Sequence, residues 1–179
     1  DELLPSDLPS AASPDCSETR PVFVFSHGKG GIRWQSPFLM EHLASHGYLV
    51  IAPDHTYDTF LESEDDRLAA LVMRRPHDLS RAYDWLLDSR YADCVDESQG
   101  FAVGGHSFGG YTTLAVAGAA IAPHEAVASC EDRPESWCDE LAEWAQEHPD
   151  IHAIDLADDR AWAAVALAPF GGAIFAENV

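Results

Sequence analysis

The sequence predicts an α/β protein built on a mostly parallel sheet, and two observations support this. First, its short apolar runs do not alternate with polar residues, which is typical of strands buried on both faces of a parallel sheet. These runs span residues 21–26, 48–52, 101–104 and 162–168. Second, segments of helical character lie between the runs. Because strands and helices alternate along the chain, the crossovers are expected to be right-handed.

Each intervening helix is predicted from its own pattern. Within residues 36–46, Leu39 and Leu43 are one turn apart, and a glycine follows as the expected C-cap. Within residues 78–88, apolar side chains fall on one helical face. Residues 111–121 are apolar and rich in alanine, which suits a helix packed on the centre of a sheet.

The 179 residues are expected to form a single, partial α/β domain, residues 1–179. Residues 1–20 are rich in Pro, Ser, Asp and Ala and are predicted to be an irregular lead-in. Two insertions interrupt the alternation: residues 56–77 are charged, and residues 123–160 are polar and acidic. Either insertion can cover a substrate cleft, with 123–160 as the candidate lid, or be ordinary surface decoration.

Acidic residues dominate the composition, with 31 Asp and Glu against 10 Lys and Arg and a net charge of −21. Such a field repels nucleic acids and anionic membranes, so nucleic acid is not an expected partner. It suits a secreted protein that must stay soluble, or it is a solvated surface without a recognition role. No apolar run approaches the roughly 18 residues of a membrane span, so none is expected.

The cysteines predict the redox environment of the protein. Cys130 and Cys138 lie within one polar insertion, whereas Cys16 and Cys94 each precede a predicted strand and so share one edge of a parallel sheet. Disulfides 16–94 and 130–138 are therefore predicted, with a secreted or periplasmic location. The alternative is buried free thiols in a cytosolic protein. The sequence has no CxxC motif or zinc-ligand spacing, and no metal or organic cofactor is expected.

The motif GHSFG at residues 105–109 follows a predicted strand directly and leads into a predicted helix. GxSxG alone is a weak signal, but this strand–turn–helix context is that of a nucleophile elbow. There a serine occupies a sharp, strained turn, and Gly105 and Gly109 let the strand and the helix approach closely. Ser107 is thus the predicted nucleophile, with the helix N-terminus directed at a developing oxyanion. The alternative is a glycine-rich turn with an incidental serine.

A second glycine-rich motif, SHGKGG at residues 26–31, follows the first predicted strand. Its backbone can approach a reacting carbonyl and supply half of an oxyanion hole. A phosphate-binding loop is the rival interpretation, but no GK[ST] or GxGxxG pattern follows. His27 precedes Ser107, against the usual Ser–acid–His order, so it is expected to brace the loop. Asp54 and His55 are expected to pack a loop instead of binding a metal.

Together, PVFVFSHGKGG, SPFLMEHLASHGYLVIAPDH and GGHSFGGYTT resemble the platelet-activating factor acetylhydrolase and dienelactone-hydrolase-like branch of the α/β-hydrolases. The cutinase-like polyester hydrolases are similar at a greater distance. The resemblance implies an α/β-hydrolase fold with Ser107 as nucleophile and the backbone N–H groups of Lys29 and Phe108 as the oxyanion hole. Relatives often carry an apolar residue at position 29, although the role needs its backbone alone. A serine in place of the cysteine of dienelactone hydrolases favours an esterase.

The catalytic acid and histidine of such a triad follow the nucleophile in the chain. In most of the fold they come after strands beyond the run at 162–168, where this sequence soon ends. His124, His148 and His152 follow Ser107 but lie in the polar insertion, which makes them weak candidates. A second chain or a C-terminal segment is therefore expected to supply the triad Asp and His, and to cover the apolar edge of the last strand.

The predicted activity is that of a carboxylesterase- or lipase-like serine hydrolase, which forms an acyl-enzyme on Ser107 and acts on a small-molecule or polymeric ester. A serine peptidase or amidase is one alternative, since the same elbow supports it. A non-catalytic binding protein that keeps the elbow without the triad is another. The fold alone does not distinguish them.

Overall fold

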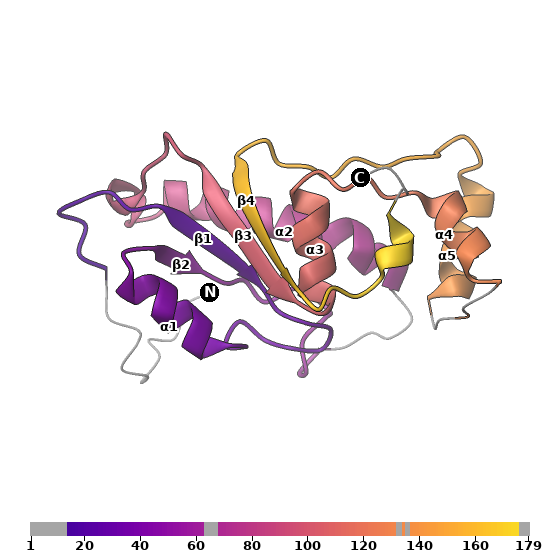
Figure 1. The fold of residues 1–179 in the computed structure, drawn as a ribbon, viewed down its shortest axis with the longest axis horizontal. Helices are drawn as coiled ribbons and strands as arrows, with labels where there is room; N and C mark the ends of the chain where they lie inside the picture. Colours follow the sequence, from indigo (N-terminus) through magenta and orange to yellow (C-terminus); the bar gives the residue numbers. More distant parts are fainter. Residues whose placement is uncertain (1–13, 63–67, 132–133, 135–136, 176–179) are drawn as a thin grey trace.

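The computed structural model describes residues 14–62, 68–131, 134 and 137–175, so most of the predicted lead-in lies outside the described residues. The strands form a four-stranded sheet of order β2-β1-β3-β4 (Figure 1). All neighbouring strands are parallel. The strands are β1 (Val22–Ser26), β2 (Leu49–Ile51), β3 (Phe101–His106) and β4 (Ala161–Leu167). The predicted α/β fold with a parallel sheet is thus confirmed.

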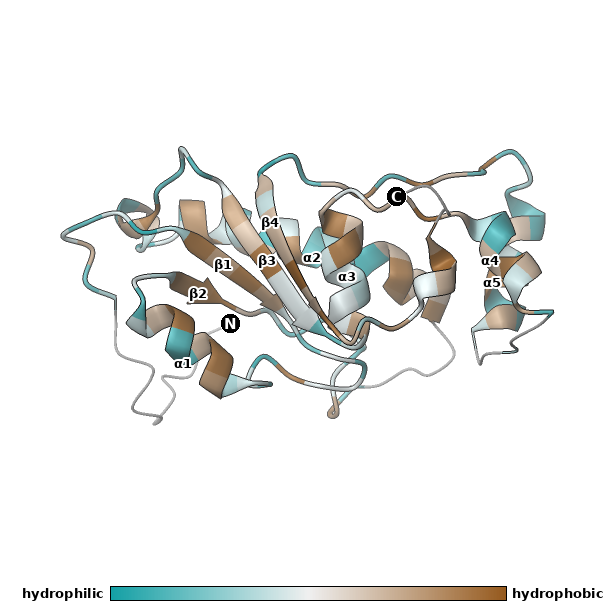
Figure 2. Ribbon diagram, viewed as in Figure 1, coloured by the Kyte–Doolittle hydropathy of each residue, from teal (hydrophilic) through white to brown (hydrophobic). Residues whose placement is uncertain are grey.

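Helices cover both faces of this sheet. On one face, helix α1 (Pro37–Ser45) packs its apolar residues against Phe23 and Phe25 of β1. On the other face, helices α2 (Leu68–Asp88) and α3 (Phe108–Val116) pack against Val22 and Val24. Because successive strand residues point to opposite faces, Val22–Phe25 of β1 are all apolar, and Figure 2 shows the strand largely in brown.

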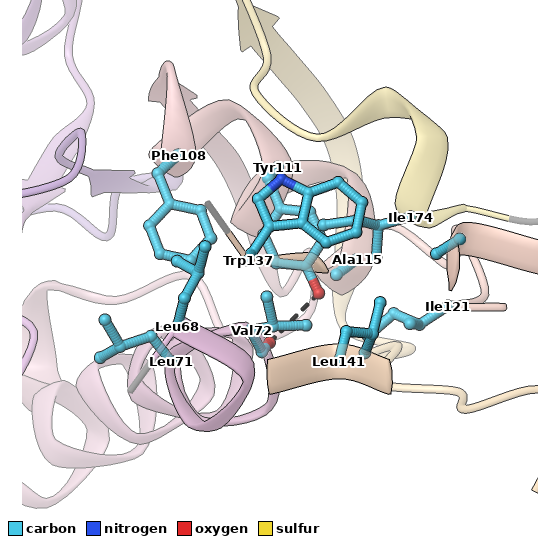
Figure 3. Close-up of a cluster of buried hydrophobic side chains, with 11 residues drawn as sticks. Leu68, Leu71, Val72, Phe108, Tyr111, Ala115, Ile121, Trp137, Leu141 and Ile174 are labelled. Atoms are coloured by element: carbon cyan, nitrogen blue, oxygen red, sulfur yellow. Dashed lines mark hydrogen bonds between the residues drawn. The ribbon is translucent and has the colours of Figure 1, made fainter. Parts of the chain in front are cut away.

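Helix α2 begins at Leu68, so the prediction of a helix over 78–88 was too short and the second half of the charged insertion is helical. Pro76 lies inside this helix and has no N–H to donate to the carbonyl of Val72. The Tyr111 hydroxyl of α3 donates to that carbonyl instead, at 3.2 Å. Figure 3 draws this hydrogen bond as a dashed line. A contact from a distant segment thus satisfies the backbone group that Pro76 leaves without its usual partner.

Helix α3 begins at the predicted elbow and ends at Val116, so the predicted helix over 111–121 was displaced towards the C-terminus. The chain turns at Gly118, whose φ of 105° a side chain rarely allows. Ile121 then pairs with Ile154 in an isolated antiparallel bridge.

The predicted polar insertion contains helices α4 (Pro123–Ser129) and α5 (Cys138–Glu147). Trp137 and Leu141 are buried in one cluster with Leu68 and Val72 of α2 (Figure 3). The apolar residues of the insertion thereby add to the core of the domain. Two 3₁₀ turns complete the elements, η1 (Ala92–Cys94) and η2 (Gly172–Ile174).

Both predicted disulfides are present, Cys16–Cys94 and Cys130–Cys138. The first joins the segment before β1 to the segment before β3, the shared sheet edge that the sequence indicated. The second joins the end of α4 to the start of α5. Among the described residues, none of the helices has the length and apolarity that crossing a membrane requires.

Strand β4 lies at one edge of the sheet and differs from the central strands in its exposure. Trp162, Val165 and Leu167 are exposed, whereas every residue of β1 is buried. An apolar strand at an open edge presents unpaired backbone groups and apolar side chains to its surroundings.

Candidate functional site

The predicted elbow and the glycine-rich loop, residues 26–31, meet at the carboxyl edge of the sheet. Ser26 ends β1 and is paired in register with Gly105 of β3. The two strands are parallel and adjacent, so the segments that follow them leave the same edge side by side. A β-carbon built on Gly28 would lie 3.5 Å from Cβ of Ser107. The structure therefore brings together the two motifs that the sequence singled out.

Ser107 occupies the sharp turn between β3 and α3. Its backbone has φ 56° and ψ −117°, a conformation that non-glycine residues rarely adopt. The Ser107 N–H donates to the carbonyl of Leu167 at 2.9 Å, and its own carbonyl accepts from the N–H of Phe170 at 2.9 Å. Both partners lie in one segment, the end of β4 and the residues after it, and this segment holds the turn in its strained form. The Ser107 side chain is half-buried and His106 is exposed.

Gly105 and Gly109 allow the close approach that this turn requires. A β-carbon on Gly109 would lie 2.0 Å from the Ser26 carbonyl oxygen, and one on Gly105 would lie 2.4 Å from the Gly109 carbonyl oxygen. Both positions meet backbone, which cannot rotate away as a side chain would. Helix α3 consequently packs directly on the end of β1.

Phe108 is the first residue of α3, so its N–H is one of those that the helix itself leaves without a partner. The positive end of the helix dipole lies at the same place, next to Ser107. This arrangement favours negative charge beside the serine hydroxyl.

The glycine-rich loop is held by side chains on both sides of Lys29. The Gly28 N–H donates to Oε1 of Gln35 at 2.6 Å, and the Gly30 N–H donates to Oδ1 of Asp58 at 2.8 Å. His27 Nδ1 bonds the carbonyl of Gly28 at 2.7 Å. His27 is fully buried and braces the loop, as the sequence analysis expected.

Beneath the loop, Arg75 of α2 is fully buried. Its guanidinium forms an ion pair with Asp58, donates to the carbonyl of His27 and donates to Oγ of Ser26 at 3.2 Å. Nε donates to Oγ1 of Thr112 at 3.2 Å. Burial lowers the pKa of Arg75 to about 10, with Asp58 acting against that shift, so the group stays charged at neutral pH.

Arg75 and Asp58 are functional-site residues that were not predicted from the sequence, although the sequence holds a signal for Arg75. Arg75 lies on the same helical stripe as Leu68, Leu71 and Leu79, all buried apolar residues of α2. A charged residue in such a stripe is buried only when it is paired. The partner Asp58 lies in the loop after β2 and carries no signal of its own.

His55 links Ser26 to Asp78 in a second hydrogen-bonded chain. Its Nε2 lies 2.9 Å from Oγ of Ser26, and its Nδ1 lies 2.8 Å from Oδ2 of Asp78. Since the guanidinium of Arg75 donates to Ser26, the serine hydroxyl donates to Nε2, and neutral His55 donates from Nδ1 to Asp78. This Ser–His–Asp order resembles a catalytic triad, but Ser26 and His55 are fully buried. The chain is a structural network inside the protein.

Burial first, and then Arg75 and His27, place the pKa of His55 well below its usual 6.5, while burial raises the pKa of Asp78. Below pH 6.5 the unfolded chain binds a proton that folded His55 does not. The stability that neutral His55 contributes to the folded protein is fully present above pH 6.5. It is lost as the pH falls towards the pKa of His55 in the folded protein. We expect the free energy of unfolding to lose up to about 1.4 kcal/mol per pH unit between pH 6.5 and 5 from this group.

Denaturant titrations of the wild type and of His55→Gln at several pH values measure this effect. The variant, which keeps a donor and an acceptor but cannot titrate, should show the shallower pH dependence. His27, whose pKa burial also lowers, is present in both proteins, so the difference between the two curves reports the titration of His55 together with its coupling to His27. If the free energy of unfolding depended on pH equally in the two proteins, His55 would not be the group that titrates.

Asp54 pairs with Arg33 through bonds of 2.7 and 2.8 Å, which supports its expected role in loop packing. Among the described residues, no group of three or more His, Cys, Asp or Glu side chains is arranged to hold a metal ion.

The histidines of the polar insertion lie away from the elbow. The rings of His124 and His152 are 5.1 Å apart, and His148 stacks on Trp144 at 4.3 Å. In Figure 1, helices α4 and α5 lie at the right of the molecule, on the far side of η2 from α3.

A family model described as chlorophyllase matches residues 5–127, which include the glycine-rich loop and the elbow. No curated protein sequence matches the chain. Among solved structures, a ferulic acid esterase from Streptomyces cinnamoneus is 33% identical, covering 55% of this chain and 32% of its own, with a TM-score of 0.47. This chain therefore spans about a third of that esterase's length. Because the family model matches more than half of its residues, the chain belongs to the chlorophyllase family, in the esterase branch of the α/β-hydrolases.

Proposed function

We propose that this protein is a serine hydrolase of carboxylic esters that forms an acyl-enzyme on Ser107. The observation that carries the proposal is the strained backbone of Ser107 at the start of α3, with the glycine-rich loop beside it. A strained serine is retained where its position serves the chemistry. Membership of the chlorophyllase family supports the same reaction class.

In the proposed reaction, Oγ of Ser107 attacks the ester carbonyl carbon while a base takes the hydroxyl proton. The carbonyl oxygen becomes an oxyanion, and the backbone N–H groups of Phe108 and Lys29 are the proposed donors to it. Collapse of the tetrahedral intermediate releases the alcohol, which takes up the proton. A water molecule then attacks the acyl-enzyme by the same route, releases the acid and restores the serine.

The base and its acid partner are proposed to come from a second chain or a C-terminal segment. The two buried histidines near the elbow already form hydrogen bonds elsewhere. His27 bonds the glycine-rich loop, and His55 bonds Ser26 and Asp78. The exposed apolar residues of β4 suit such an additional segment, because covering them removes apolar surface from water.

The proposed substrate is a small-molecule or polymeric ester, and the proposed location is secreted or periplasmic. Disulfides persist in oxidising compartments and are rare in the cytosol, and this chain forms two of them. Acidic residues outnumber basic ones 31 to 10, which suits a protein that stays soluble outside the cell.

Intact mass spectrometry after treatment with a fluorophosphonate tests the proposal. In the full-length protein, Oγ of Ser107 should form a bond to phosphorus with loss of fluoride, giving one adduct per molecule that Ser107→Ala does not form. A non-reducing spectrum also reveals any second polypeptide. Hydrolysis of an ester but not of its matched amide would separate an esterase from a peptidase. A protein that is neither labelled nor active on either substrate would refute the enzyme and favour a binding protein.

A further inference from the structure

A buried ion pair joins the two halves of the proposed oxyanion hole. Arg75 and Asp58 are 0% and 1% exposed in their side chains, although each carries a charge. Taking two charges out of water costs several kcal/mol per ion, and the pair attraction need not recover it. Such a pair is weak evidence for stability, so the groups that it contacts indicate its role.

On the loop side, the pair bonds the backbone on both sides of Lys29. Arg75 donates to the carbonyl of His27, and Asp58 accepts from the N–H of Gly30 at 2.8 Å. These two bonds fix the path of the intervening backbone. One bond holds the peptide before and the other the peptide after the one that carries the Lys29 N–H.

On the elbow side, the same guanidinium contacts α3. Its central carbon lies 4.5 Å from the ring centroid of Phe108, a cation–π contact. Nε donates to Oγ1 of Thr112, whose hydroxyl donates to the Phe108 carbonyl at 2.9 Å. Arg75 therefore contacts the loop and the first turn of α3 at once.

We propose that Arg75 and Asp58 are positioning residues, which hold the backbone of the glycine-rich loop in register with Ser107 so that both oxyanion donors face one point. This inference rests on the proposed function. Neither side chain touches the substrate in this role; they act through the backbone of residues 27–30 and through Phe108. An oxyanion donor is effective only within a few tenths of an ångström of its required position.

Asp58→Asn is the sharpest test, because it keeps the shape of the side chain and removes its charge. The amide has one acceptor oxygen where the carboxylate has two, so the ion pair is lost, and an oxygen turned towards Arg75 leaves the Gly30 N–H without its acceptor. In the full-length protein we expect kcat on 4-nitrophenyl butyrate to fall about 10- to 100-fold with little change in KM, since removal of a whole oxyanion donor costs about 10²- to 10³-fold. Arg75→Lys should behave similarly, because an ammonium lacks the planar fork that reaches Asp58, Ser26 and His27 together.

A trifluoromethyl ketone separates positioning from a general loss of structure. Ser107 adds to its carbonyl carbon and creates an oxyanion, whereas the matched methyl ketone stays largely unadded. Asp58→Asn should weaken inhibition by the fluorinated ketone by the same factor as kcat and leave the methyl ketone nearly unchanged.

Two control variants make the comparison specific. Asp84→Asn breaks another Arg–Asp pair, that with Arg160, which is exposed, so both inhibitors and kcat should be unchanged. Leu79→Ala opens a cavity where α2 packs against Val22 and Val24 of β1. It should lower stability, although Leu79 does not contact the glycine-rich loop. If Asp58→Asn and Arg75→Lys resembled Leu79→Ala, losing stability but keeping kcat and the inhibitor ratio, the positioning role would be refuted.

Amide hydrogen exchange tests whether the glycine-rich loop depends on the Arg75–Asp58 pair, and it needs no enzyme assay. The Gly30 N–H should be protected in the wild type and should exchange at least tenfold faster in Asp58→Asn, with the amides of β3 unchanged. Equal exchange at Gly30 in both proteins would overturn the proposal even if the enzyme were active. An inactive wild type with this exchange pattern would refute the proposed hydrolase and leave the pair as a device that holds the loop.

Discussion

Replacing Ser107 by alanine is expected to lower kcat for a small ester by about 10⁴- to 10⁶-fold, because the acyl-enzyme cannot form. The remaining rate would come from the oxyanion donors, which still stabilise a transition state attacked directly by water. Steady-state kinetics with 4-nitrophenyl butyrate, together with the fold of the variant checked by circular dichroism, measures the effect. We expect the variant to fold, since alanine removes only the hydroxyl.

Ser26→Ala provides the matched control for this experiment. Ser26 belongs to the buried Ser–His–Asp chain with His55 and Asp78, which does not include Ser107. We expect a loss of about tenfold or less in kcat, from a disturbed network, and unchanged labelling by a fluorophosphonate. If Ser26→Ala abolished labelling while Ser107→Ala kept it, the assignment of the nucleophile would be wrong.

Replacing Gly109 by alanine is expected to destabilise the protein by about 3 kcal/mol or more and to abolish activity, because overpacking at an immovable contact forces the backbone apart. The new β-carbon would lie 2.0 Å from the Ser26 carbonyl oxygen, so β1 and α3 must separate. That separation moves the glycine-rich loop away from Ser107. Urea unfolding, followed by tryptophan fluorescence, measures the loss of stability.

Gly172→Ala is the control for this substitution. A β-carbon at Gly172 meets nothing within 4 Å, so its stability should change by less than about 0.5 kcal/mol. Gly105→Ala should resemble Gly109→Ala, since its β-carbon would lie 2.4 Å from backbone. Full stability and activity in Gly109→Ala would show that α3 and β1 do not need to pack this closely at Gly109.

Local patterns determined the strands and the elbow, because each depends on neighbouring residues. The Cys16–Cys94 pair, 78 positions apart, followed instead from the parallel order predicted for the strands. A strand buried on both faces is apolar on both whatever helices cover it, as residues 22–25 are. The strand, GHSFG and an alanine-rich helix follow one another in the chain, so the elbow needs no distant contact to be recognised. The turn itself requires Gly105, whose β-carbon would meet the Gly109 carbonyl, whereas the approach of β1 requires Gly109, whose β-carbon would meet the Ser26 carbonyl oxygen.

The tertiary structure decided the extent of α2 and the network beneath the glycine-rich loop. Pro76 is tolerated inside a helix because the Tyr111 hydroxyl bonds the carbonyl of Val72, 39 positions away in the chain, which proline leaves without a partner. Arg75 and Ser26 are 49 positions apart and meet because α2 crosses beneath β1. A buried charge is stabilised by whichever groups the fold brings to it, and their identity is set by packing in three dimensions, which no local pattern in the sequence contains.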